Sequence, residues 1–326
     1  MITDIRVMTS PQHDPYRNLA IEYYLLRQVA EGQCILYLWR NSRCVVVGAN
    51  QLAMNECDIE ALEKDGGFLV RRKSGGGAVY HDLGNLNFTF LMPSVDFDEA
   101  RQSEVILLAL HSLGLDCLKS GRNDLTIDGR KFSGHAYYHH DGHSYHHGTI
   151  MLEVKEQELA KYLHVSKLKL RDKHVRSVRS RVINLKQLKP QLTVEELSQS
   201  LISSFEEVYG LKAGTLSAGE LDERKIGEYR QMFASPEWKY DRQKIFQYSR
   251  QAKYDWGIVR IDYDLNGGII SDCAVYSDSL QADYLARAAG IIRGKSINAL
   301  SDYLNDREHE RINEDIIALL SGKEQS

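Results

Sequence analysis

The chain has 326 residues, of which 43% are hydrophobic and 26% charged, and its formal net charge is −4. This length exceeds the size at which one hydrophobic core usually stops growing, so we expect two domains of ordinary globular composition. The near-balanced charge argues against a nucleic-acid-binding protein, and the apolar runs are too short to span a membrane.

The five cysteines are scattered through the chain and include no C-x-x-C pair. This pattern argues against a disulfide framework and against a zinc site, and it favours a reducing compartment. The first residues do not have the basic and apolar regions of a signal peptide. We therefore expect a cytoplasmic protein.

The first predicted elements are a helix and several short strands. Proline at the start and apolar residues at helical spacing predict a helix over 15–29. Two β-rich runs, 34–39 and 44–48, predict a hairpin. Strands are predicted over 67–72 and 87–92, and we expect them to be neighbours across a glycine-rich segment.

The next elements alternate between helices and hairpins. An amphipathic helix is predicted over 98–113, and a capping box formed by Thr193 and Glu196 predicts the start of another that ends near 209. Asp128-Gly129 favours a tight turn between strands 124–127 and 131–133. A further strand is predicted over 147–154.

The character of the chain changes after about residue 235. A hairpin is predicted from 256–263 and 269–276, followed by helices near 280–289 and 297–304. We therefore expect a larger domain over 1–240 and a small α/β domain over 245–326. The chain has no regular βαβ rhythm, so the prediction is an α+β fold with a mixed or antiparallel sheet flanked by helices.

Three consecutive glycines at 75–77 are the centre of the most informative segment, 71–87. Glycine lets backbone N–H groups approach a ligand closely, and Arg71 and Arg72 can neutralise phosphate oxygens. The segment is neither a Walker loop nor a dinucleotide fingerprint. A flexible surface loop is one interpretation, and a nucleotide site of another kind is the other.

Lys131 stands in a second dense segment, 121–134. A lysine there is often a solvated edge residue. If a carboxylate attacks the α-phosphate of ATP, however, a fixed ammonium stabilises the negative charge that grows on the phosphoryl oxygens. Asn123 or Asp124 could hold a Mg²⁺ ion that bridges the phosphates.

Taken in order, these segments resemble the motifs of the lipoate–protein ligase A family. They are RRxSGGGAVYHDLGN at 71–85, GRNDL at 121–125, RKFSG at 130–134, HHGT at 146–149 and SVRSRVxNL at 177–185. The resemblance covers roughly 14–209, and the C-terminal part is similar to the small accessory domain of the family. It implies the biotin/lipoate ligase fold, with a sheet resembling that of class II aminoacyl-tRNA synthetases.

The resemblance also implies a reaction. Lipoate and ATP would give lipoyl-AMP and pyrophosphate, and the lipoyl group would pass to a lysine of an acceptor protein. Lys131 would be the catalytic residue, and Asp124 would bind Mg²⁺. Residues matching the ATP or adenylate motifs are Arg72, Gly77, Ala78, Val79, Tyr80, Asn123, Asp124 and Lys131. Residues matching the lipoate channel are Ser74, Gly75, Gly76, His81, Lys131 and His147.

The expected partners are lipoyl-domain acceptors: acyltransferase subunits of 2-oxoacid dehydrogenases, the glycine-cleavage H protein or an H-like protein. We expect a monomer that binds neither nucleic acid nor membrane. The sequence departs from the family at 170–174, where a small glycine-containing turn is usual, and at Lys73, where a small residue is commoner. These departures leave the local loop conformation and the preferred acceptor open.

Two other clusters have less certain interpretations. Six of the twelve histidines fall between His135 and His147. Because Asp141-Gly142 reads as a turn, we expect an exposed hairpin tip there rather than a metal site, with His147 alone in the family motif. A basic run over 167–181 is either a solvated face, a segment that closes over the adenylate, or a surface that attracts an acidic acceptor.

Two alternative functions remain. An octanoyl or lipoyl transferase of the same fold needs a nucleophilic cysteine near Lys131, and Cys117 and Cys273 are poorly placed for it. A non-catalytic lipoate- or nucleotide-binding homologue would keep the pocket without turnover, although Arg72 and Lys131 are both present.

Overall fold

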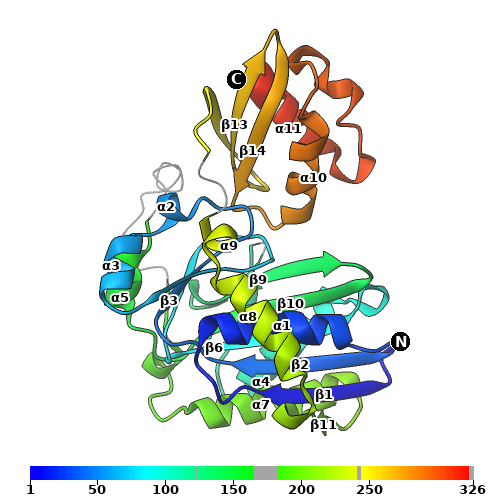
Figure 1. Ribbon diagram of the computed structural model, residues 1–326. Coiled ribbons are helices and arrows are strands. Elements are labelled where there is room, and N and C mark those ends of the chain that lie inside the picture. Colours follow the sequence, from blue (N-terminus) through cyan, green and yellow to red (C-terminus); the bar gives the residue numbers. More distant parts are fainter. Residues whose placement is uncertain (122, 165–181, 241–243, 323–326) are drawn as a thin grey trace.

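The computed structural model describes residues 1–121, 123–164, 182–240 and 244–322, which form three sheets with helices around them (Figure 1). The largest sheet is mixed, because β1 is parallel to β11 and β2 while the other neighbouring pairs are antiparallel. In spatial order its eight strands are β11 (Gly214–Thr215), β1 (Asp4–Thr9), β2 (Gln33–Trp39), β6 (Asn85–Pro93), β10 (His143–Met151), β9 (Arg130–His140), β8 (Asp124–Ile127) and β7 (Leu118–Ser120).

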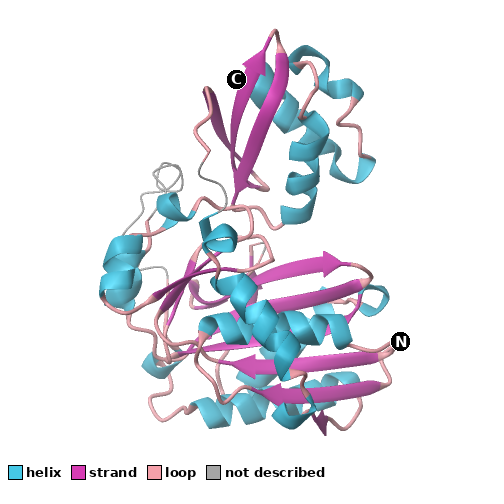
Figure 2. Cartoon of the chain, viewed as in Figure 1, coloured by secondary structure: helices cyan, strands magenta, loops and turns pink. Residues whose placement is uncertain are grey.

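Helices cover both faces of this sheet (Figure 2). Successive side chains of a strand point to opposite faces. Leu36 of β2 therefore packs in the core that contains α4 and α7, whereas Tyr37 packs in the core that contains α1 and α8. The predicted α+β class, with a mixed sheet flanked by helices, is confirmed. The four helices are α1 (Pro15–Gln28), α4 (Glu99–Ser112), α7 (Val194–Tyr209) and α8 (Glu223–Ala234).

A small second sheet carries the glycine-rich segment between two of its strands. Its central strand β3 is parallel to β4 and antiparallel to β5, and residues 72–78 connect β4 to β5. Short helices pack against it in a separate hydrophobic core. The elements are β3 (Cys44–Val47), β4 (Phe68–Arg71), β5 (Val79–His81), α2 (Ala53–Glu56), α3 (Ile59–Lys64) and α5 (Glu156–Tyr162).

Two strand pairings expected from the sequence are wrong. The runs 34–39 and 44–48 do not form a hairpin, since β2 belongs to the large sheet and β3 to the small one. The strands predicted over 67–72 and 87–92 are not neighbours either, because β4 pairs with β3 and β6 pairs with β2 and β10. Strands buried on both faces carry no local signal that identifies their partners.

The other local predictions for the first 210 residues are confirmed. Helices α1, α4 and α7 form where expected, and Thr193 and Glu196 make both bonds of a capping box. Asp128 and Gly129 have φ values of 51° and 71°, as a tight hairpin turn requires. The strand predicted over 147–154 is found over 143–151, so β10 begins and ends earlier than expected, and it pairs with β9 across Asp141-Gly142.

The C-terminal residues form the third sheet, which lies at the top of Figure 1 and is reached through α9 (Pro236–Tyr240). The hairpin and the first helix are confirmed, a 3-10 helix (Ile297–Asp302) replaces the second, and β12 and α11 were not anticipated. The boundaries 1–240 and 245–326 stay a prediction. The elements are β12 (Tyr248–Tyr254), β13 (Gly257–Asn266), β14 (Ile269–Ser277), α10 (Ala282–Ile292) and α11 (Glu310–Ser321).

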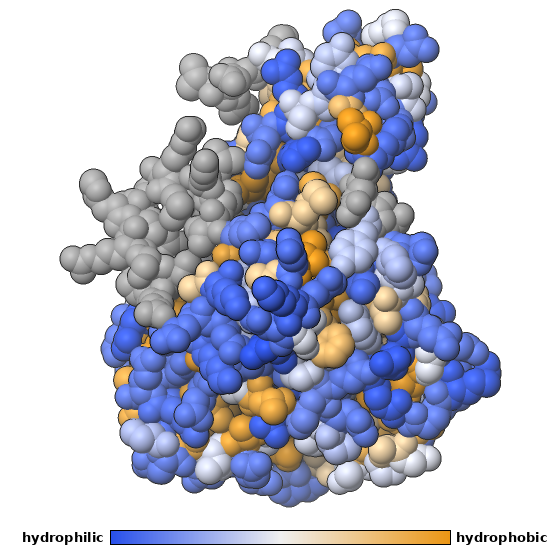
Figure 3. All heavy atoms as spheres, turned by 60° about the vertical axis from the view of Figure 1, so that its left-hand side comes forward, coloured by the Kyte–Doolittle hydropathy of each residue, from blue (hydrophilic) through white to orange (hydrophobic). Residues whose placement is uncertain are grey.

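The surface drawn in Figure 3 is mainly hydrophilic, and its hydrophobic side chains lie in small separate groups. Among the helices formed by the described residues, none has the length and apolar character needed to cross a bilayer.

Candidate active site

Strand register lines up residues from five neighbouring strands of the large sheet. Trp39 faces Asn87, and Asn87 faces Thr149. The backbone N–H of Gly134 donates to Thr149 Oγ1 at 3.3 Å, and Gly134 faces Asp124. Directly opposed residues share a face of a sheet. All five line one cavity of about 310 Å³.

The two sides of this cavity differ in polarity. Leu19, Trp39 and Val46 belong to the core under α1 and give an apolar wall. Asp124 and Lys131 contribute the charged wall from β8 and β9. Three strand spacings separate β2 from β9, which amounts to about 14 Å at roughly 4.8 Å per spacing. The cavity therefore suits an elongated molecule with an apolar end and an anionic end.

Lys131 forms an ion pair across the β8–β9 hairpin. Its Nζ lies 2.7 Å from Asp124 Oδ1, and both side chains are about one-third exposed, at 36%. A Cβ at Gly134 would lie 2.8 Å from this Nζ, so the glycine leaves the space that the ammonium occupies. Asn123 uses its side chain within the hairpin, where Nδ2 donates to the carbonyl of His135 at 2.8 Å.

Arg72 holds the glycine loop, defined as residues 72–78, in place. Its guanidinium donates to the carbonyls of Gly75 at 2.6 Å, Gly77 at 2.8 Å and Val46 at 3.1 Å. Burial lowers the pKa of Arg72 to about 10, which still leaves it charged at neutral pH. Gly76 has a φ of 88°, a conformation that favours glycine.

The residues beside Arg72 attach the loop to α1 and α9. Arg71 is buried, and it donates to the carbonyls of Gln51 at 2.7 Å and Trp238 at 3.1 Å. These hydrogen bonds direct its guanidinium to backbone carbonyls outside the cavity wall. The ammonium of Lys73 lies 4.4 Å from the ring centroid of Tyr23 and 4.6 Å from that of Trp238. The unusual lysine is thus held by cation–π contacts.

Two predicted lipoate-site histidines line the cavity. His81 is buried, its Nδ1 accepts from Asn41 Nδ2 at 3.3 Å, and burial, with the nearby charge of Arg72, lowers its pKa to about 3. His147 lies 2.8 Å from Ser74 Oγ through Nε2. His81 is therefore a neutral group in the cavity wall.

The expectation of an exposed histidine tip is wrong for two further residues. His135 and His146 are buried, at 3% and 0% exposure, and His146 Nε2 lies 2.9 Å from His135 Nδ1. Burial lowers the pKa of His135 to about 3 and that of His146 well below its usual value. The alternation of β9 and β10 turns these side chains inward.

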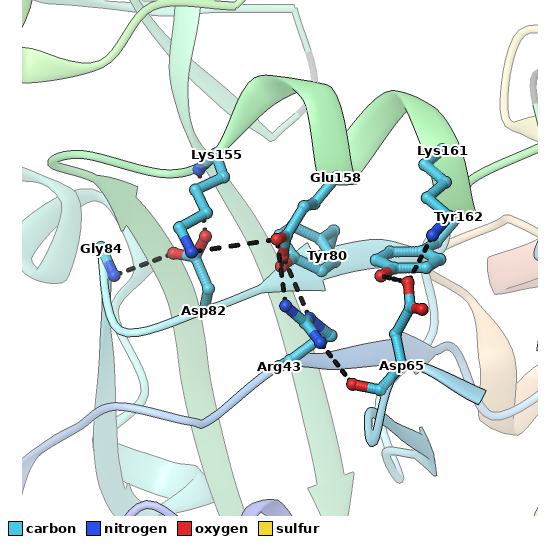
Figure 4. Close-up of polar contacts among 9 residues, drawn as sticks. All are labelled: Arg43, Asp65, Tyr80, Asp82, Gly84, Lys155, Glu158, Lys161 and Tyr162. Atoms are coloured by element: carbon cyan, nitrogen blue, oxygen red, sulfur yellow. Dashed lines mark hydrogen bonds and ion pairs between the residues drawn. The ribbon is translucent and has the colours of Figure 1, made fainter. Parts of the chain in front are cut away.

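Tyr80 points away from the cavity and into a polar cluster, defined as Arg43, Tyr80 and Glu158 (Figure 4). The Tyr80 hydroxyl donates to Glu158, and Arg43 donates to both oxygens of that carboxylate at 3.1 and 3.0 Å. Burial opposes ionisation of Glu158, yet the bonds from Arg43 and Tyr80 lower its pKa. The cluster joins β5 to α5.

The cavity brings together most of the predicted site residues. Ser74, Gly75 and Tyr80 are not in its wall. Residues missed by the sequence analysis include Trp39, Asn87 and Thr149, for which only strand pairing gives a signal. The basic run 167–181 and the segment 170–174 lie outside the described residues. The predicted residues in the wall are Arg72, Gly76, Gly77, Ala78, Val79, His81, Asn123, Asp124, Lys131 and His147.

Comparison with family models accounts for most of the chain. Residues 14–206 match the lipoyl protein ligase A/B catalytic domain, and residues 243–320 match the bacterial lipoate protein ligase C-terminus. The chain is similar to a lipoate-protein ligase A of Psychrobacter cryohalolentis, with 37% identity over 86% of this chain and 85% of that protein.

Solved structures give the same neighbours. P. falciparum LipL1 in complex with lipoate aligns with a TM-score of 0.86 and 25% identity, over 98% of this chain and all of that chain (100%). A bipartite lipoate protein ligase of Thermoplasma acidophilum, described with its E2 lipoyl domain, aligns with a TM-score of 0.64 and 29% identity, over 75% of this chain and 98% of that chain. A lipoate-protein ligase A bound with ATP aligns with a TM-score of 0.63 and 27% identity, over 74% of this chain and 99% of that chain.

Proposed function

The chain belongs to the lipoate–protein ligase A family and is a ligase, and from that premise we propose that it works in two steps. In the first step a lipoate carboxylate oxygen attacks the α-phosphorus of ATP, which gives lipoyl-AMP and releases pyrophosphate. In the second step a lysine amine of an acceptor protein attacks the acyl carbon, which forms an amide and releases AMP and a proton.

The observation that carries this proposal is the polarity of the cavity. Lipoate is an elongated molecule with an apolar ring end and a carboxylate end. The apolar wall at Trp39 and Val46 suits the ring, and the charged wall at Lys131 lies about 14 Å away by strand spacing. With the ring at the apolar wall, we propose that the carboxylate lies beside the Lys131 ammonium, which would stabilise the charge of the transition state.

The glycine loop supports the nucleotide half of the proposal. Gly77, Ala78 and Val79 line the same cavity as Lys131, and we propose that backbone N–H groups of this segment contact the anionic part of the nucleotide. Arg72 acts on this site mainly by shaping the loop, because its guanidinium bonds to loop carbonyls. The relatives cited above hold lipoate in one structure and ATP in another, as their descriptions say.

Magnesium is the metal that this chemistry calls for. Mg²⁺ commonly takes one or two carboxylates together with substrate phosphates, and the cavity-lining carboxylate of Asp124 fits that mode. The ion would neutralise phosphate charge and would compete with Lys131 for Asp124.

A cysteine-dependent transferase is less well supported. All five cysteines are buried and free, and none of them is among the residues that line the described cavity. Burial raises the pKa of the Cys117 thiol to about 12, which disfavours the thiolate that acyl transfer needs. Turnover itself would exclude a purely binding homologue.

The acceptor, compartment and assembly are proposed on the same premise. The Thermoplasma relative is described with an E2 lipoyl domain, and we propose a lipoyl domain or an H-type protein as acceptor here. The free cysteines fit a reducing cytoplasm. We propose a monomer, which light scattering of the purified protein would test.

Pyrophosphate exchange tests the first step. We expect lipoate-dependent exchange of labelled pyrophosphate into ATP, and we expect Lys131→Ala to lower it by roughly 100-fold or more, in the range for loss of one preorganised charge contact. Lys189→Ala, which changes a lysine that donates to the carbonyl of Leu113 outside the cavity, is the matched control.

Three outcomes would contradict the proposal: exchange that needs biotin or an amino acid, exchange that survives Lys131→Ala, and acceptor modification without ATP. Mass spectrometry of acceptor domains after incubation with lipoate and ATP tests the second step. The expected product carries a lipoyl amide on one lysine.

A further inference from the structure

Strand β10 carries two adjacent buried histidines that face opposite sides of the sheet. His146 turns toward Gln102 of α4, with its Nδ1 3.0 Å from Gln102 Oε1. His147 turns toward Glu22 of α1, with its Nδ1 2.8 Å from Glu22 Oε1. Glu22 is only 2% exposed, and neither the family motifs nor the cavity wall includes it.

The contacts of His147 form a chain of hydrogen bonds with one direction. A carboxylate only accepts, so His147 Nδ1 carries the proton that goes to Glu22. In the tautomer with its proton on Nδ1, Nε2 accepts from the hydroxyl of Ser74 at 2.8 Å, and Ser74 Oγ accepts from Arg72 Nε at 3.0 Å. The Thr89 hydroxyl donates to the same Glu22 oxygen at 2.7 Å.

The connectivity of Ser74, His147 and Glu22 matches that of a serine–histidine–acid triad. Ser74 is nevertheless fully buried, at 0% exposure, and does not line the cavity, whereas His147 does. A serine that no substrate reaches is not a nucleophile. The chain instead connects a carboxylate on α1 to Arg72, the residue that holds the carbonyls of the glycine loop.

We propose that Glu22 is a positioning residue for this active site: by fixing the tautomer of His147 it orients Ser74 and Arg72, and so sets the conformation of the glycine loop. The catalytic consequence rests on the function proposed above, whereas the tautomer does not. Glycines lose much conformational freedom on ordering, so a loop that contains three of them benefits from an external anchor.

The experiment compares Glu22→Gln with Glu22→Ala in the full-length protein. Nitrogen-15 NMR of the His147 ring, assigned by its loss in His147→Gln, reports the tautomer without any ligand. We expect the proton on Nδ1 in the wild type and in Glu22→Gln, whose amide oxygen also accepts. In Glu22→Ala we expect it on Nε2.

Kinetics give the second readout. Glu22→Ala should lower kcat/KM for lipoate in pyrophosphate exchange by about 100-fold, the scale of a misplacement of roughly 1 Å. Glu22→Gln should retain most of the wild-type kcat/KM. A thermal melt of each variant measures its stability separately. Gln102→Ala removes the hydrogen-bond partner of His146 on the other face of the sheet. It should leave the His147 tautomer unchanged, which makes it the matched control.

A proton on Nε2 of His147 in the wild type would overturn the proposal, and so would unchanged kcat/KM in Glu22→Ala. If Glu22→Ala does not fold, Ser74→Ala decides instead: it should keep the Nδ1 proton and lose kcat/KM, and full activity would refute the proposal. Absence of lipoate-dependent exchange in the wild type would reject the proposed function alone, because the tautomer is measured independently.

Discussion

Lys131 illustrates how one residue depends on its neighbours. The sequence left it as either a solvated edge lysine or a catalytic cation. Its ammonium occupies a space that exists because residue 134 has no Cβ, and it lies beside the carboxylate of Asp124. The sequence supplies the positive charge of Lys131, and the fold determines where that charge lies.

This geometry predicts that Gly134→Ala impairs catalysis more than folding. The new Cβ would lie 2.8 Å from Lys131 Nζ, and the flexible lysine end would shift with little loss of stability. We expect kcat/KM for pyrophosphate exchange to fall by about 10- to 100-fold, as for a misplaced catalytic group. Exchange kinetics and a thermal melt measure both effects.

Gly227→Ala is the matched control for that substitution. Gly227 lies inside α8, and a Cβ there would meet no atom within 4 Å. Alanine in a helix interior should raise the free energy of unfolding by about 1 kcal/mol and leave exchange unchanged. Equal activity of the two variants would contradict the role assigned to Gly134.

At the scale of elements, helices α1, α4, α7 and α10 and the hairpins closed by tight turns followed from local sequence, while the pairing of strands distant along the chain did not. The capping box at Thr193 and the turn at Asp128 each involve residues within a few positions of one another. The pairing of β3 with β4 and of β6 with β10 joins segments that are distant along the chain. Local periodicity does not contain this information.

The polar cluster of Arg43, Tyr80 and Glu158 shows how such distant elements are joined, because it links β5 to α5 (Figure 4). Arg43→Ala removes the guanidinium and leaves the carboxylate of Glu158 with the Tyr80 hydroxyl and the more exposed Lys155 ammonium, 3.8 Å away, as partners. We expect the free energy of unfolding to fall by roughly 2 kcal/mol, the scale of a partly buried charged hydrogen bond. Urea denaturation measures this change.

An exposed ion pair provides the comparison. Arg224 and Glu228 are 71% and 58% exposed and lie one turn apart on α8. Arg224→Ala should cost less than about 0.5 kcal/mol, as exposed helix pairs do. A cost equal to that of Arg43→Ala would show that the cluster does not hold α5 more firmly than an ordinary surface pair.

At the scale of the whole molecule, the C-terminal sheet region contacts the candidate active site directly. The carbonyl of Asn50 accepts from the N–H of Ser277 at 2.8 Å, and its Nδ2 donates to the carbonyl of Ala282 at 2.7 Å. The N–H of Gly76 donates to the carbonyl of Ser279 at 2.9 Å. The glycine loop is therefore in contact with both parts of the chain.

Asn50→Ala tests this contact. Removing the side chain takes away one partner of residues 277–282, a loss of about 1–2 kcal/mol for a buried hydrogen bond. We expect faster hydrogen–deuterium exchange at the amides of Ser277 and Gly76, with unchanged protection in the interior of β6. Uniform loss of protection would indicate global destabilisation instead.

The sequence by itself determined the family, helices α1, α4, α7 and α10, and the tight turns, because each of these depends on residues within a short segment. It also identified the glycine loop and Lys131 as one candidate site. Only the tertiary structure decided that Arg72 bonds to the loop and that Tyr80 points toward Glu158. Those contacts depend on strand pairing between segments that are remote in the sequence. Because buried polar groups are almost always hydrogen-bonded, the residues that the fold brings close become their partners.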